Sequence, residues 1–208
     1  MYFTIYRDVA NGWRWTLYAA NNRKIADSGE AYVEKAGAPG AAHSVALYLD
    51  DYASGITVTN NIVKDPGTHG LQAHGGSNIS VHNNIFDLGT GTTSTILFQG
   101  VNTNAPQNVS VFQNIIESAA PVQKLWDLID QTSLPSITNN LYWNTVGGLM
   151  QSSAPLQDTN PHFGDPKFAN PAAGNYALGA GSAAGAIGFQ QIDQSQIGLK
   201  PTTAHWYA

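Results

Sequence analysis

Four segments of this 208-residue chain share one pattern, in which an alternating apolar run, an asparagine and a second apolar run follow one another. The aligned asparagines are spaced by 23 residues (61 to 84), 30 (84 to 114) and 26 (114 to 140). Repeats of about this length are typical of solenoids, and a period of two indicates strands. We therefore expect a mainly β fold, a short right-handed parallel β-helix with one coil per repeat. The four segments are ITVTNNIV (56–63), ISVHNNIF (79–86), VSVFQNII (109–116) and SITNNLYW (136–143).

The asparagines lie where the chain must bend between two strands of a coil. Asparagine adopts the left-handed backbone conformation that a sharp bend requires more readily than most residues. Stacked coils also place equivalent side chains above one another, where their amides can hydrogen-bond in a ladder. We predict this structural role for Asn61, Asn84, Asn114 and Asn140.

Composition restricts the partners of the chain. Only 11% of the residues are charged, well below the roughly 25% usual in globular domains, and the net charge is −5. All three arginines lie at or before Arg23, so no basic face for nucleic acid can form in the repeats. Cysteine is absent, which excludes thiolate metal sites, and no apolar run reaches the length of a membrane span.

The chain divides into four parts by its patterns. We expect a small antiparallel β meander (1–36), a linker (37–42), the β-helix coils (43–145) and a C-terminal capping tail (146–208). Residues 36–44, which include the linker, read AGAPGAAHS, in which glycine and proline oppose a helix. We expect the first part to cover one end of the solenoid and the tail to cover the other.

The first part resembles the YegP-like family of small repeats over about 36 residues. A family repeat continues into a helix, whereas this segment is cut short at the linker. The matching residues are Phe3-x-Ile5-Tyr6, Trp13-Arg14-Trp15-x-Leu17-x-Ala19-Ala20-Asn21, Ile25-Ala26-x-Ser28-Gly29-Glu30 and Tyr32.

The tail resembles the C-terminal tails of carbohydrate-active β-helix proteins with the pectate-lyase-like fold. Together with YLDDYASGITVTNNIV, the resemblance covers about residues 43–200. It implies a polysaccharide or oligosaccharide partner and an extracellular or periplasmic location, although FTIYRD after Met1 is not a signal peptide. The group includes both glycoside hydrolases and polysaccharide lyases. The matching residues are Asp165-Pro166-x-Phe168, Asn170-Pro171, Gly174-Asn175-Tyr176-x-Leu178, Gly181-Ser182-x-Ala184 and Gly188-Phe189 through Gly198.

One outward row of polar side chains is the candidate binding groove. Alternation in the strand before each bend turns every second residue outward. Aromatic faces stack on sugar rings, and carboxylates and amides bind hydroxyls. The candidate substrate-binding residues are Tyr48, Gln72, Gln99 and Trp126, and the row itself is Asp50, His74, Gln99 and an aspartate of the fourth coil.

Glycoside hydrolysis is the first functional hypothesis, since it needs a protonated acid and a second carboxylate. The candidate catalytic residues are Asp50, Asp51, His74, Asp127 and Asp130. Asp50 and Asp51 face opposite ways in a regular strand, so a turn-capping role competes with catalysis for both, most strongly for Asp51.

Two other hypotheses remain open on the sequence. A polysaccharide lyase would need a positioned base and cations, which the scarcity of Lys and Arg in the repeats disfavours. Bound Ca²⁺ could supply that charge, but no loop has the required ligand spacing and no metal site or other cofactor is predicted. A non-catalytic glycan-binding or structural fragment is the third hypothesis, with oligomers forming through open coil ends.

Overall fold

The computed structural model describes residues 2–7, 13–18, 24–27, 45–50, 53–101, 104–129, 133–152 and 156–196. The first three ranges contain strands, β1 (Tyr2–Arg7), β2 (Trp13–Tyr18) and β3 (Lys24–Asp27), which pair antiparallel in the order β1-β2-β3. Of residues 1–36, the structure thus describes three strands and not their side chains. Within the described part there is no α-helix, and hence no helix that could cross a membrane.

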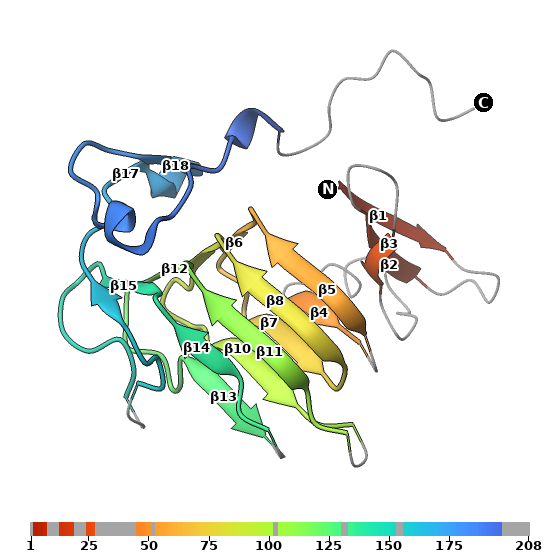
Figure 1. Cartoon of the computed structure of the whole chain (residues 1–208). Helices are drawn as coiled ribbons and strands as arrows, with labels where there is room; N and C mark the ends of the chain where they lie inside the picture. The colour runs from red at the N-terminus through yellow and green to blue at the C-terminus, as the bar shows by residue number, and fades with distance from the viewer. Residues whose placement is uncertain are drawn as a thin grey trace, which may run out of the picture.

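Residues 45–163 form three parallel sheets whose strands alternate along the chain (Figure 1). This arrangement confirms the predicted mainly β fold of stacked parallel coils. The first sheet is β4 (Val45–Leu49), β7 (His69–His74), β10 (Ser94–Gln99) and β13 (Trp126–Ile129). The second is β5 (Ser54–Thr59), β8 (Ser77–His82), β11 (Gln107–Phe112) and β14 (Ser136–Thr138). The third is β6 (Ile62–Lys64), β9 (Ile85–Asp87), β12 (Ile115–Ser118), β15 (Leu141–Asn144) and β16 (His162–Phe163).

Equivalent residues of successive coils lie side by side, so the core consists of stacked apolar rows. In the second sheet Val58, Val81, Val111 and Ile137 are in register and all are buried. The third sheet contributes the row Val63, Phe86, Ile116 and Tyr142 to the same core. Apolar residues stack on apolar residues in these rows, so the alternation of the sequence decides which face of each strand is buried.

Two neighbouring residues have different roles at the bend between the second and third sheets: one makes the turn of the backbone, and the next is buried. The first residue takes the left-handed conformation, with φ of 58° at Asn60, 53° at Asn83, 54° at Gln113 and 56° at Asn139. The second residue is the buried asparagine predicted from the repeat. The left-handed residue and the buried asparagine after it thus form one unit of the fold, in which the first residue is Asn in three coils and Gln113 in the other.

The buried asparagines form the predicted ladder. The backbone N–H and the side-chain Nδ2 of Asn61 both donate to Oδ1 of Asn84, at 3.0 and 2.9 Å. Asn84 donates in the same way to Asn114, and Asn114 to Asn140. The ladder thus has one direction, with each rung donating to the rung that follows it in the chain.

The ladder runs one rung beyond the repeats recognised in the sequence. Asn140 donates from its backbone N–H and its Nδ2 to Oδ2 of Asp158, which also accepts the hydroxyl of Tyr142 at 2.8 Å. A carboxylate accepts without needing to donate, so Asp158 can close a chain of amide donors. The buried Tyr142 hydroxyl has a pKa raised well above its usual value, by burial first and then by the Asp158 carboxylate.

The C-terminal tail lies on the side of the solenoid, and we expected it at the end. In the third sheet Ile62, Ile85, Ile115 and Leu141 point outward, away from the core row. The tail covers this apolar outer row, and its hairpin of β17 (Phe168–Asn170) and β18 (Asn175–Leu178) lies above it in Figure 1. The tail residues buried against the row are Tyr176, Ala184, Ile187, Phe189 and Ile192.

Removing one rung should destabilise the protein strongly. Asn114 is fully buried, and its side chain bonds to Asn84, Asn140 and the carbonyls of Val81 and Phe112. Because each buried partner left unpaired costs about 1–3 kcal/mol, we expect Asn114→Ala to lower the free energy of unfolding by at least about 3 kcal/mol. Chemical denaturation measures this, with the exposed Gln107→Ala as a control expected to stay within about 0.5 kcal/mol of wild type. A loss below about 1 kcal/mol for Asn114→Ala would show that the ladder contributes little.

Candidate functional site

The outer face of the first sheet carries two rows of side chains in register across four coils. One row is Tyr48, Gln72, Leu97 and Asp127. The other runs from His74 to Gln99 and Ile129, and Asp50 precedes it beside His74. We refer to the polar members of both rows as the polar strip: Tyr48, Asp50, Gln72, His74, Gln99 and Asp127.

His74 is the centre of one half of the polar strip. Its Nδ1 lies 2.9 Å from the Tyr48 hydroxyl and 3.8 Å from Oδ1 of Asp50. The two rings are stacked, with centroids 6.0 Å apart and planes inclined by 27°. An imidazole beside a phenol and a carboxylate can exchange a proton with either, and the tautomer of His74 decides which of them it bonds.

An amide pair forms the other half. Nε2 of Gln72 donates to Oε1 of Gln99 at 2.9 Å across neighbouring strands. Both side chains are half-buried and come from adjacent coils. This bond engages the Nε2 group of Gln72 and the Oε1 atom of Gln99 and fixes the orientation of both amides. The pair therefore presents a defined acceptor, Oε1 of Gln72, and a defined donor, Nε2 of Gln99, to a ligand.

The structure unites Asp50, His74 and Gln99 in one row, as the alternation of the sequence indicated. The fourth member is Ile129 and not an aspartate, because Asp127 belongs to the row of Tyr48 and Gln72. Asp127 pairs with Lys124 at 3.0 Å between Nζ and Oδ1. Asp51 and Asp130 lie outside the described residues, so their roles stay predictions.

Trp126 does not line the polar strip. Its register partners are Ile96 and, one coil further, the fully buried Leu71, and its own side chain is 4% exposed. The ring packs edge-on against Tyr142 in the core. The proposed sugar-stacking role for Trp126 is therefore wrong, since a buried indole offers no face to a ligand.

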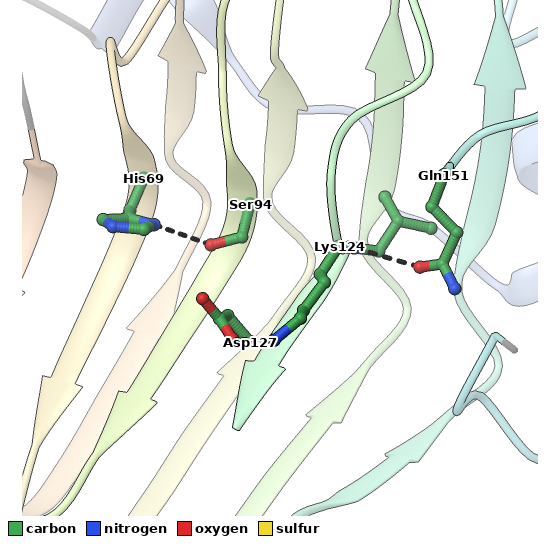
Figure 2. A network of polar contacts seen from close by, with 6 residues as sticks. His69, Ser94, Lys124, Asp127 and Gln151 are labelled. Atoms are coloured by element: carbon green, nitrogen blue, oxygen red, sulfur yellow. Dashed lines mark hydrogen bonds and ion pairs between the residues drawn. The ribbon is translucent and has the colours of Figure 1, made fainter. Parts of the chain in front are cut away.

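A second polar network lies near the start of the same strands (Figure 2). Nδ1 of His69 lies 2.7 Å from the Ser94 hydroxyl, and Figure 2 shows Asp127 and Lys124 beside them. Burial lowers the pKa of His69, and the charge of Asp127 opposes this shift. His69 is the first residue of β7 and is in register with Ser94 of β10. The half-buried His69 therefore helps to hold the first sheet together beneath the strip.

Two carboxyl groups that sequence analysis missed face each other on the third sheet. Asp87 and Glu117 are register partners on neighbouring strands. Each lies three residues after a ladder asparagine (84 to 87 and 114 to 117), and this spacing is the signal that could have found them. Oδ2 of Asp87 accepts the hydroxyl of Tyr176 at 2.6 Å, so the tail reaches over the pair.

Among the described carboxyl groups, Glu117 has the most clearly shifted pKa. Burial above all, and then the charges of Asp87 and Asp165, raise its pKa to about 7, while the charge of Lys64 opposes them. Its side chain belongs to a residue only 6% exposed. Paired carboxylates are the signature of glycoside hydrolysis, but a pair covered by the tail has no access for a polymer. We therefore interpret Asp87 and Glu117 as part of the contact between tail and sheet. Among the described residues no group of three or more His, Asp or Glu side chains could hold a metal ion.

The buried acid pair makes stability depend on pH. The folded-state pKa of Glu117 exceeds the usual 4.5, so its stabilising contribution is complete below about 4.5 and is lost as the pH rises to about 7. We expect Glu117→Gln to be more stable than wild type by about 2 kcal/mol at pH 8 and to match it near pH 4.5. Thermal or chemical denaturation across this range measures the difference. The control is Asp193→Asn at an exposed tail carboxylate, which should change little; an identical pH profile for wild type and Glu117→Gln would contradict the prediction.

Comparison with known proteins gives one family match. A family model described as a domain of unknown function, DUF1508, matches residues 8–48. This range overlaps the segment that resembles YegP-like repeats and ends within β4. No curated protein and no solved structure matches the chain. The family match therefore leaves most of the polar strip uncovered, and its function has to be inferred from its own geometry.

Proposed function

We propose that the protein binds a neutral polysaccharide or oligosaccharide along the polar strip. The observation that supports this best is the pairing of Tyr48 with His74 and of Gln72 with Gln99 on one outer sheet face. Each pair joins two neighbouring coils. A row of fixed hydroxyl, imidazole and amide groups beside an aromatic ring matches the alternating hydroxyls and apolar faces of sugar rings.

Charge favours a neutral chain over a uronate polymer. The net charge is −5, and the strip itself contains Asp50 and Asp127. Lys124 is already paired with Asp127, which reduces the positive charge available to an anionic sugar. The resemblance of residues 43–200 to carbohydrate-active β-helix proteins of the pectate-lyase-like fold supports the same class of ligand and an extracellular or periplasmic location.

Hydrolysis is a second candidate, supported by the closeness of His74 to Asp50. Asp50 and Asp127 do not form the acid pair of a glycosidase, because they adjoin strands at opposite edges of the sheet. Three strand spacings separate them by about 14 Å, and inverting enzymes use about 6.5–9.5 Å. An active enzyme would therefore have to use Asp50 with His74, or with groups outside the described residues. Binding is the function that the geometry supports more directly.

Two histidines of one coil provide a matched test of binding. His74 lies on the polar strip, whereas His82 lies on the second sheet, stacked on Phe112 with ring centroids 4.9 Å apart. We expect His74→Ala and Gln99→Ala each to weaken binding of a neutral oligosaccharide at least tenfold in calorimetric or NMR titration. His82→Ala should leave the affinity within twofold, because its face does not contact the ligand.

The ligand panel should contain xylo-, gluco-, manno- and fuco-oligosaccharides together with an oligouronate. Equal losses for His74→Ala and His82→Ala, or no binding of any sugar, would contradict the proposed site. Release of reducing sugar that Asp50→Asn abolishes would show hydrolysis. A rise in ultraviolet absorbance from unsaturated uronates would show a lyase and overturn the choice of a neutral ligand.

A further inference from the structure

Lys124 and Asp127 form an ion pair on the outer face of the first sheet. Nζ of Lys124 lies 3.0 Å from Oδ1 of Asp127. Asp127 belongs to the same outward row as Tyr48 and Gln72, so its partner Lys124 lies on the face where we propose that sugars bind. Figure 2 shows the two side chains pointing toward each other. The pair therefore places a positive group beside the proposed ligand.

The two members of the pair differ in exposure. The side chain of Lys124 is 44% exposed, whereas that of Asp127 is 14% exposed. An ammonium group can donate three hydrogen bonds, and Asp127 accepts one of them. The amine of Lys124 can thus contact a ligand, but the carboxylate of Asp127 already balances its charge.

The backbone around the pair is held in place by the coils on both sides. The backbone N–H of Lys124 donates to the carbonyl of Thr93 at 3.2 Å. The next N–H, that of Leu125, donates to Oε1 of Gln151 at 3.0 Å (Figure 2). Asp127 itself lies within β13, which pairs with β10. Only side-chain freedom therefore opposes the ion pair, because the two residues are already positioned by their strands.

Lys124 is the one lysine beside the polar strip among the described side chains. The other two described lysine side chains, Lys64 and Lys167, donate to backbone carbonyls of the tail. His69 lies close enough to Asp127 to interact with its charge, but burial lowers the pKa of His69, which favours the neutral ring at pH 7. A carboxylate-bearing ligand on this part of the sheet would thus depend on Lys124 for its counter-charge.

We propose that Asp127 is a specificity-determining residue of the polar strip, which excludes uronates by neutralising Lys124. The proposal rests on the proposed sugar-binding function, and it adds that the strip already contains the cation that an acidic sugar needs. A uronate carboxylate at Lys124 would meet the like charge of Asp127 at the same amine. A neutral sugar avoids this repulsion, because its hydroxyls can donate to the carboxylate and accept from the amine.

The variant Asp127→Asn should shift the preference of the strip toward acidic sugars. Asparagine has nearly the same shape and its Oδ1 can still accept from Lys124, but it leaves the lysine charge unbalanced. We expect the ratio of oligouronate affinity to neutral-oligosaccharide affinity, for chains of equal length, to rise at least fivefold in calorimetric or NMR titration at low salt. The gain should shrink in about 1 M salt, where charges are screened over about 3 Å.

Two control variants separate the release of Lys124 from a change in net charge. Asp193→Asn also removes one negative charge, but from the exposed tail, and should leave the affinity ratio within twofold. Asp127→Asn combined with Lys124→Met has the net charge of wild type and should abolish the gain. Asp127→Ser, which frees Lys124 with a smaller polar side chain, should raise the ratio as Asp127→Asn does. NMR spectra of each variant show whether it is folded.

The outcomes distinguish this role from the binding function itself. If wild type binds neutral sugars but neither Asp127→Asn nor Asp127→Ser raises the ratio, the role of Asp127 is overturned and the binding site stands. An equal rise in Asp193→Asn or in the double variant would also overturn it, because the gain would then not come from Lys124. A wild type that binds no sugar, or that prefers the oligouronate, would overturn both proposals.

Discussion

The hydrogen bonds of the asparagine ladder are the constraint on which the rest of this structure depends. Each coil must bend between its second and third strands, and the bend buries backbone groups that the sheets cannot pair. The ladder satisfies the backbone N–H of one rung with the side-chain oxygen of the next, and the side-chain Nδ2 reaches back to the carbonyl two residues before it. The strands on both sides of the bend are thereby held in register, which aligns the core rows and the outward rows together.

Alignment of the rows explains why one side of the solenoid is available for ligands and another is not. The outward row of the third sheet is apolar from Ile62 to Leu141, and burial against the tail removes it from water. The outward rows of the first sheet are mostly polar, and no part of the tail cluster covers them. The tail therefore covers the acid pair of Asp87 and Glu117, and it leaves the polar strip uncovered.

The ladder also gives the two ends of the solenoid different characters. At one end Asn61 presents an acceptor, and at the other Asp158 accepts the last donors through its side chain. A stack of amides that all point one way cannot have identical ends. This polarity is a property of the repeated hydrogen-bond pattern and not of any single residue.

The sequence by itself determined the strand alternation, the repeat and the identity of the ladder asparagines, because these depend on local periodicity and on bend chemistry. It also placed Asp50, His74 and Gln99 in one outward row, since alternation inside a strand fixes facing. It could not determine the fourth member of that row or the burial of Trp126, because the register of β13 follows from its pairing with β10. The closing rung Asp158, the position of the tail and the raised pKa of Glu117 were likewise decided by tertiary structure, because each arises from residues far apart in the chain that meet only when the coils stack.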